Sequence, residues 1–371
     1  MLPLQTIADY YTNHFRIEPL YELFGREKFH EIEFGALLYS EYHQKTYFTR
    51  NKTFETPEQF IEYFQQHPPL KLYFGARYQK DEPSQSVAEA RWLSTTFKFD
   101  LDVNDSELIR ASVCGCQGKT ICNACFNIVL EAVLFLINTL EDDFDIGDPI
   151  VYFSGSRGVH VHFPKNPFIA PSQTYTAERD ARRSLMYYLN MVKEHTDDNT
   201  GQLSARFIHK NITTDNMWCR ILNMLFIPYI LETSSERLTQ LTWKRLVRNK
   251  KKFVLKKVTS EQAPVFIQWL KQTMRRYQSN QLFFTQQRPS ETALIRKQHL
   301  LGWRLNPENV LHNLLTYRYP RFDATPTIDL RKVIKVPMSL DASSGYVVQR
   351  IPLEQIRDFS FTLDDLQKIS E

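Results

Sequence analysis

The chain has 371 residues, of which 42% are hydrophobic and 13% aromatic, a composition that excludes a disordered protein and supports a large core or two compact regions. Its formal net charge of +4 is compatible with a nucleic-acid partner without requiring one. No apolar run approaches about 18 residues without a charge, and the opening MLPLQTIADYY lacks the regions of a secretory signal, so we expect an intracellular protein without a membrane span.

Helical and strand patterns alternate through the N-terminal part of the chain. Residues 1–27 carry apolar and aromatic side chains at helical intervals, which predicts one or two short amphipathic helices. The runs EFGALLY and KTYFTR within residues 32–50 are typical of strands. A helix capped by Thr56 is predicted over residues 56–66, and a further strand over residues 70–78.

Residues 97–103, FKFDLDV, alternate strictly between apolar and polar side chains. On a strand, Asp100 and Asp102 would share one face with Lys98. Two neighbouring carboxylates repel each other, and a divalent cation bound by oxygen ligands removes that repulsion. Taken alone, the short D-x-D pattern is more often a half-buried strand with a solvated polar face.

A cysteine cluster follows within residues 112–127. Four of the five cysteines form the close pairs C-x-C and C-x-x-C: Cys114, Cys116, Cys122 and Cys125. This spacing is typical of a tetrahedral zinc site, whereas a C-x-C loop would strain a disulfide. We therefore predict one structural zinc ion, because four thiolates leave no open position for chemistry, and expect Cys219 to be a core residue.

Residues 150–163, IVYFSGSRGVHVHF, predict two strands joined by a small-residue turn. Glycines in that turn would allow close backbone approach, so that amides, the Ser154 hydroxyl and the Arg157 guanidinium converge on a phosphate. An ordinary hairpin turn is the simpler interpretation of this segment by itself. Combined with the D-x-D strand, it indicates a site for a metal and a polyphosphate.

The remaining segments are read mainly as helices. The apolar run 124–140 and the arginine-bearing run 176–195 predict helices, and the stretch up to residue 304 is expected to be mostly helical. Within it, residues 244–257, KRLVRNKKKFVLKK, form either a template contact or a solvated basic face. The final segments predict a helix over 305–315, strand-like pieces VIKVP and YVVQRIP, and a closing amphipathic helix over 353–371.

Three blocks together resemble a known family. FDLDV, then SGSRGVH, then PRFD at 320–323 with a following lysine in VIKVP are similar to the signatures of the archaeo-eukaryotic primase superfamily, in particular the small catalytic subunit of DNA primase. The resemblance implies an α+β fold with mixed and antiparallel sheets flanked by helices. Residues 1–171 and 305–371 would form the catalytic core with its zinc knuckle, and residues 172–304 an inserted, mainly helical subdomain.

The resemblance also implies roles for individual residues. Three carboxylates would hold two catalytic Mg²⁺ or Mn²⁺ ions: Asp100, Asp102 and Asp323. Asp329 competes for the third position, but PRFD matches the family block. Nucleotide binding would fall to the following set: Arg50, Ser154, Gly155, Ser156, Arg157, Gly158, His160 and Lys335. Of these, Arg50 is as well explained as a surface arginine that ends a strand.

Two positions depart from the family pattern. Tyr73 stands where many primase small subunits carry an acidic residue near the ribose 2′-hydroxyl, which leaves the preference between ribo- and deoxynucleotides open. Asp341 stands where eukaryotic relatives commonly carry a histidine that approaches the base.

The implied function is DNA-directed synthesis of short RNA primers on single-stranded DNA, a nucleotidyltransferase reaction. Three alternatives remain. A stand-alone primase-polymerase of a virus or mobile element would use dNTPs, a metal-dependent nuclease would need no triphosphate cage, and a zinc-bearing, non-catalytic nucleic-acid-binding subunit would need no carboxylates.

The resemblance implies partners as well. A large subunit with an iron–sulfur domain is expected, because only Cys219 remains once the cluster is assigned, and a replicative polymerase or helicase is a further candidate. The compartment would be the nucleus in a eukaryote and the cytoplasm in an archaeon or a virus-infected cell.

Overall fold

The computed structural model describes the chain with several gaps. The described residues are 1–82, 85–106, 110, 113–118, 120–165, 167–168, 174–196, 203–207, 220–226, 228, 231, 268, 271–272 and 318–369. They belong to two compact units: Met1–Leu189 with Phe322–Glu371, and Asn190–Arg321. The two boundaries predicted from the sequence, at residues 171 and 305, both precede the boundaries between these units.

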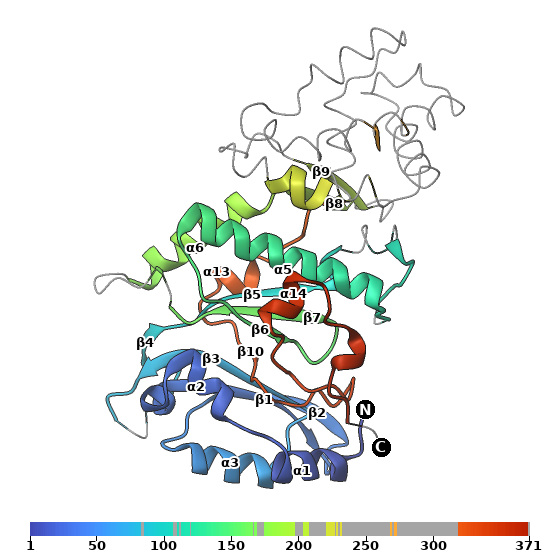
Figure 1. The fold of residues 1–371 in the computed structure, drawn as a ribbon. Coiled ribbons are helices and arrows are strands. Elements are labelled where there is room, and N and C mark those ends of the chain that lie inside the picture. Colours follow the sequence, from blue (N-terminus) through green and yellow to red (C-terminus); the bar gives the residue numbers. More distant parts are fainter. Residues whose placement is uncertain are drawn as a thin grey trace. The chain divides into compact units, whose positions relative to one another are not determined.

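A five-stranded antiparallel sheet forms one layer of the first unit (Figure 1). Its path is β10-β3-β1-β2, with β4 also paired to β3. The strands are β1 (Ile32–Ser40), β2 (Lys45–Lys52), β3 (Lys71–Gln79), β4 (Arg91–Ser94) and β10 (Ile334–Lys335). Because β10 comes from the C-terminal part of the chain, this sheet joins segments that lie far apart in the sequence.

Short helices cover one face of that sheet (Figure 1). They are α1 (Leu4–Asn13), α2 (Glu18–Phe24), the 3-10 helix η1 (Arg26–Glu31) and α3 (Pro57–Gln66). The predicted cap of α3 is confirmed, since the Gln59 amide donates to Thr56 Oγ1 at 3.3 Å. Apolar side chains of these helices and of β1 and β3 make one buried cluster that includes Ile7 and Phe60.

A three-stranded antiparallel sheet forms the next layer, in the order β5-β7-β6. These strands are β5 (Phe97–Asp102), β6 (Ile150–Phe153) and β7 (Gly158–Phe163), and the 3-10 helix η2 (Val103–Ser106) follows β5 directly. The helices α5 (Asn123–Phe144) and α6 (Tyr175–Leu189) lie on the side of this sheet away from the five-stranded one (Figure 1). The strand, turn and strand predicted over residues 150–163 are confirmed.

Helix α5 is long and apolar enough to cross a membrane, but 67% of its most apolar window is buried inside the protein. Its hydrophobic residues face the core, including Phe126, Val133 and Leu140. The apolar character of α5 is therefore explained by packing.

Helix α6 is tied to the first unit by a buried arginine. Arg182 is fully buried and donates to the carbonyls of Thr96 and Thr327, both at 3.2 Å. Thr327 belongs to the short helix α13 (Thr325–Ile328). These bonds connect α6 to the start of β5 and to the segment that carries the PRFD block.

Two secondary-structure predictions were wrong. The helix expected over residues 176–195 ends at Leu189, and the residues after it form β8 (Val192–Thr196), which pairs with β9 (Leu203–Phe207) in the second unit. The closing helix expected over 353–371 is limited to α14 (Leu353–Arg357) and the 3-10 helix η7 (Leu363–Asp365). In this region isolated bridges such as Tyr346 with Lys368 replace helical bonds.

The second unit also contains the π-helix η4 (Ile221–Phe226). The basic run at 244–257 and the helix predicted over 305–315 lie outside the described residues, as does Cys219.

We predict that the aromatic core under the first sheet carries much of the stability. Phe60 is fully buried, and its ring centroid lies 4.6 Å from that of Phe34 and 4.9 Å from that of Phe64. Phe60→Ala should lower the free energy of unfolding by about 3–5 kcal/mol, measured by urea denaturation, because it leaves a cavity. Tyr42→Ala is the control, since Tyr42 is 90% exposed. Equal losses in both variants would contradict the assignment of this core.

Candidate active site and metal centre

The pairing of β5 with β7 positions the first residues of the candidate site. In this register Asp100 lies opposite His160 and Asp102 lies opposite Gly158. The distance from Asp100 Oδ1 to His160 Nε2 is 3.8 Å. The expectation that both aspartates share a strand face is met, and the same pairing brings the first two sequence blocks together.

The turn between β6 and β7 is closed by its own residues. The Ser154 amide donates to the Gly158 carbonyl at 2.9 Å, and the Gly158 amide donates to Ser154 Oγ at 3.1 Å. Gly155 has a φ of +74°, which favours glycine. A side chain at Gly158 would meet the Leu101 carbonyl at 2.5 Å. The turn therefore needs glycine at this position in order to lie against β5.

Arg157 contacts the metal-binding candidate Asp102 directly. Its Nε lies 3.0 Å and 3.1 Å from the two carboxylate oxygens. These bonds involve Nε and not the two terminal amino groups of the guanidinium, which can also donate to a phosphate. Neighbouring Ser156 is partly exposed.

Several carboxylates act on Asp100. Burial raises the pKa of Asp100 from 3.8 to about 7, and the charges of Asp102, Asp105 and Asp323 act in the same direction. The Lys335 ammonium opposes them. Since 37% of the Asp100 side chain remains exposed, the group is within reach of a ligand. Such a concentration of negative charge favours a divalent cation.

The two candidates for the third carboxylate act on different charged groups. Asp323 is among the charges that raise the pKa of Asp100, whereas Asp329 acts on Lys98 and Arg50. Asp323 Oδ1 also accepts a hydrogen bond from the Thr325 amide at 2.8 Å, where α13 begins. Both candidates therefore act on residues of β5, and the choice of Asp323 rests on the PRFD block.

Asp105 was missed by the sequence reasoning. Its Oδ2 accepts a hydrogen bond from the Asp102 amide at 3.3 Å, and its charge acts on Asp100. The signal was available, because Asp105 follows the D-x-D pattern by three positions, but only the sharp bend into η2 turns it back toward the strand.

Lys335 reaches the turn from β10. Its Nζ donates to the Ser154 carbonyl at 2.6 Å and to Asp341 Oδ2 at 2.7 Å. Burial lowers the pKa of Lys335, and Asp341 opposes that shift. The lysine predicted from the third block is therefore adjacent to the predicted phosphate turn.

Arg50 has an acidic partner inside the protein. Its Nε donates to Glu33 Oε1 at 2.6 Å, and its terminal amino group bonds to Glu33 Oε2 and to the Arg331 carbonyl. Glu33 is fully buried, so this pair anchors β2 to β1. Nucleotide binding by Arg50 stays a prediction.

Lys98 of β5 and the two histidines of β7, His160 and His162, are buried basic side chains. Lys98 is fully buried, its pKa is lowered to about 7 mainly by burial, and its Nζ donates to the Lys332 carbonyl at 2.7 Å. Burial also lowers the pKa of His162 to about 3 and that of His160 well below its usual value. Among the described residues, no hydrogen-bond partner meets either ring nitrogen of His162 or Nδ1 of His160. Lys98 shares the strand face of Asp100 and Asp102, as the alternation of β5 predicts, but unlike them it is fully buried.

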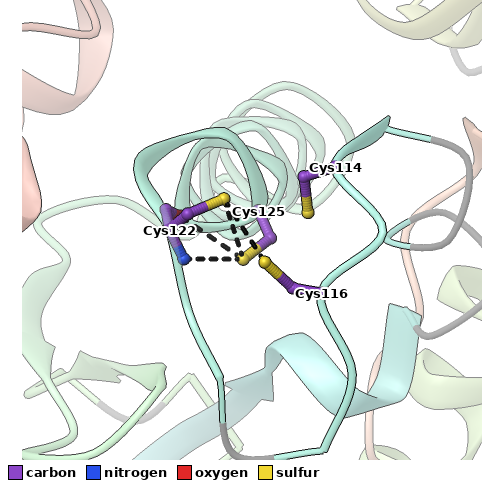
Figure 2. Close-up of side chains that lie close together, drawn as sticks. All are labelled: Cys114, Cys116, Cys122 and Cys125. Carbon is purple, nitrogen blue, oxygen red and sulfur yellow. Dashed lines mark hydrogen bonds between the residues drawn. The ribbon is translucent and has the colours of Figure 1, made fainter.

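The four clustered cysteines converge at the start of α5 (Figure 2). Cys122 precedes the helix and Cys125 lies in its first turn, while Cys114 and Cys116 come from the preceding loop. Their four sulfurs lie within 4.8 Å of one another, and all four are free thiols. The predicted cluster is confirmed.

The sulfur geometry fits zinc. Cys116 Sγ lies 3.6 Å from Cys122 Sγ, which lies 3.8 Å from Cys125 Sγ. A tetrahedron with Zn–S bonds of about 2.3 Å has sulfur separations of roughly 3.8 Å. Within the described part of the chain, no group of three or more carboxylates and imidazoles has its ligand atoms as close together as these four sulfurs.

Comparisons with known proteins agree with this arrangement. The family model for the DNA primase small subunit matches residues 99–352, more than half of the chain. A DNA primase small subunit of Sulfolobus acidocaldarius is 29% identical over 145 residues, which cover 35% of this chain and 44% of that protein. The counterpart of Methanosarcina acetivorans is 23% identical over 349 residues, 88% of this chain and 77% of that protein. The chain thus spans under half of the first relative and most of the second.

A structural comparison adds little to this. The polymerase domain of Mycobacterium tuberculosis Ligase D, in complex with DNA, is 14% identical and covers 54% of this chain and 69% of that chain. Its TM-score of 0.31 is too low to support an argument.

We predict that the cysteine cluster binds one zinc ion per chain. Cys116→Ser and Cys122→Ser should lose the metal, as measured by elemental analysis, because each removes one of four thiolates. Unfolding at the start of α5, seen as a loss of helical circular dichroism, should accompany that loss. Cys219→Ser is the control and should keep its zinc. Zinc retained by the cluster variants would exclude the site.

We predict a pH-dependent effect of Asp100 on the stability of chelator-treated protein. Its folded-state pKa of about 7 exceeds the usual 3.8, so its stabilising protonation is complete below about pH 4 and lost as the pH rises through 7. Asp100→Asn stays neutral, and its melting temperature should exceed that of wild type by about 2 °C at pH 8. The gap should close toward pH 4. A gap that is constant between pH 4 and pH 8 would contradict this charge assignment.

Proposed function

Because the chain belongs to the DNA primase small-subunit family, we propose that it synthesises short RNA primers on a single-stranded DNA template by nucleotidyl transfer. The observation that carries this proposal is the convergence of three separate segments: the carboxylates of β5 face the turn before β7, and Lys335 of β10 bonds to that turn. A carboxylate cluster beside a basic, glycine-bearing turn suits phosphoryl transfer, which depends on positioning and on charge stabilisation.

The carboxylates provide a suitable donor set for hard cations. Asp100, Asp102 and Asp323 would hold two Mg²⁺ or Mn²⁺ ions, which when bound make a 3′-hydroxyl more acidic and stabilise the leaving pyrophosphate. Oxygen ligands are the preference of these ions. Burial raises the pKa of Asp100, and the negative charges of Asp102, Asp105 and Asp323 raise it further, so a bound cation would relieve repulsion among these carboxylates.

The turn and its neighbours would bind the triphosphate. Arg157 would exchange its bonds with Asp102 for bonds with phosphate oxygens, so that nucleotide binding also frees Asp102. The Ser154 hydroxyl and the backbone of Gly155, Ser156 and Gly158 would offer further donors. His160 is held neutral by burial and would donate a hydrogen bond from its ring without adding charge.

Lys335 and Arg50 would complete the set. Lys335 is already bonded to the turn, and its side chain is 13% exposed. Arg50 lies on the same sheet but is held by Glu33, so its use by a nucleotide would need that bond to be shared. The zinc site would be structural and would fix the loop after β5 to α5.

A second candidate is a stand-alone primase-polymerase that uses dNTPs. It is favoured by Tyr73, whose ring lies 5.6 Å from that of Phe48 and whose pKa is raised to about 12 by burial. A neutral, bulky phenol in place of a carboxylate would disfavour a ribose 2′-hydroxyl.

Partners and compartment are part of the proposal. We expect a large subunit with an iron–sulfur domain, and a replicative polymerase or helicase is a further candidate partner. The compartment would be the nucleus in a eukaryote and the cytoplasm in an archaeon or for a viral protein.

The decisive test is unprimed synthesis on single-stranded DNA with labelled ribo- or deoxynucleotides and Mg²⁺ or Mn²⁺. Asp100→Ala/Asp102→Ala and Asp323→Ala should lower product formation by more than about a hundredfold, because metal-held charge contributes several kcal/mol. Asp329→Ala is the matched control for Asp323→Ala and should remain active.

Each outcome has a distinct meaning. Ribonucleotide products support the first candidate, and deoxynucleotide products support the second. Extension that occurs only from a supplied primer would point to a polymerase or to a missing large subunit. Template binding without any product would favour a non-catalytic nucleic-acid-binding subunit.

A further inference from the structure

Asp341 is a buried carboxylate placed between two lysines beside the phosphate turn. Its Oδ2 lies 2.7 Å from Lys335 Nζ and 3.2 Å from Lys71 Nζ. The Asp341 side chain is 0% exposed, whereas those of Lys335 and Lys71 are 13% and 26% exposed. The carboxylate therefore cannot contact a substrate, but both ammonium groups can.

The other oxygen of Asp341 is fixed by the chain that follows it. The Ser343 amide and hydroxyl both donate to Oδ1, the amide at 3.0 Å. Ser344 Oγ then donates to the Gly155 carbonyl at 2.5 Å. Asp341 is thus oriented by a local turn that is itself bonded to the predicted phosphate-binding turn.

Electrostatics explain why a carboxylate is needed here. Burial lowers the pKa of Lys335, and Asp341 acts against that shift. Two ammonium groups directed at one point repel each other, and a buried charge without a partner is costly. One carboxylate between them allows both lysines to stay charged and close together. The three groups then have a net charge of +1.

Lys71 and Lys335 also share a face of the five-stranded sheet. Lys335 pairs with Tyr73 in the β10–β3 register, and Lys71 precedes Tyr73 by two positions. Side chains two positions apart on a strand point the same way. Lys335 additionally donates to the Ser154 carbonyl, so this face adjoins the turn at Ser154–Gly158.

We propose that Asp341 is a positioning residue for nucleotide binding, which holds the ammonium groups of Lys335 and Lys71 at the turn so that both bind the triphosphate. This inference rests on the proposed function and extends it, because it adds Lys71 to the binding set and gives Asp341 a task that does not involve the base.

The first test compares Asp341→Asn with wild type. Asparagine keeps an acceptor for Ser343 but removes the charge. We expect Asp341→Asn to bind a non-hydrolysable nucleoside triphosphate and inorganic tripolyphosphate about tenfold more weakly or worse, by calorimetry. In primer synthesis KM for the nucleotide should rise by a similar factor, while kcat changes little.

The chain offers a matched control for the local turn. Asp358 Oδ1 accepts from the Ser360 amide at 3.1 Å and from the Ser360 hydroxyl at 2.7 Å, the same pattern as at Asp341. No lysine is paired with Asp358 among the described residues. Asp358→Asn should leave triphosphate binding unchanged, which separates the charge effect from the loss of a turn.

A second variant tests the charge argument even if Asp341→Asn folds poorly. Lys71→Met removes the neighbouring ammonium group, so Asp341→Asn/Lys71→Met leaves Lys335 without a repelling partner. The double variant should melt at a higher temperature than Asp341→Asn, whereas its triphosphate binding should stay weak because Lys71 is one of the two proposed phosphate ligands. A role in folding alone would not give rescue by the loss of a second residue.

The results separate this inference from the proposed function. If wild type binds no triphosphate, the proposed function fails. If wild type binds and Asp341→Asn binds equally well, Asp341 is not a positioning residue and the proposed function stands. Weakened binding by Asp341→Asn without any rescue of the melting temperature by Lys71→Met would also overturn the charge argument.

Discussion

The hydrogen-bonded register between β5 and β7 sets Asp100 beside His160 and Asp102 beside Gly158. The rest of the site depends on this pairing, because it brings a metal-type carboxylate pair against a phosphate-type turn. Gly158 makes the pairing possible, since a side chain there would meet the Leu101 carbonyl. A slip of one residue in this register would turn the aspartates to the apolar face. The carboxylate pair would then no longer lie against the turn.

The third block reaches this centre through buried polar bonds. Thr327 donates from its hydroxyl to the Lys98 carbonyl at 2.9 Å, and Arg182 bonds to the Thr327 carbonyl at 3.2 Å. These contacts fix α13 against β5, and Asp323 lies just before that helix. Lys335 and Asp341 fix the following segment against the turn. Buried charges are costly unless paired, so their number here indicates that geometry near the carboxylates is held at the expense of stability.

The cysteine cluster has a complementary role in the chain. Its cysteines lie in the part of the chain that connects the catalytic strand to α5. Convergence of four thiols at the first turn of α5 ties that segment to a helix whose other residues fill the core. The cluster thus lies between η2, which carries Asp105, and a helix with a largely buried apolar face.

The sequence by itself determined the main elements and the principal candidates. Periodicity was sufficient for α1 and α3, because each buries one regular face. The β6–β7 hairpin followed from two apolar runs around a small-residue turn, and residue type and spacing were sufficient for the cysteines. Long-range contacts decided the rest. Lys98 is a buried residue of β5 whose ammonium group bonds to the Lys332 carbonyl, and Arg50 is held by Glu33. The choice between Asp323 and Asp329 stays a prediction. Local patterns report which face of an element is apolar, whereas the partners of a buried charge depend on segments hundreds of positions away, such as Lys98 with Lys332.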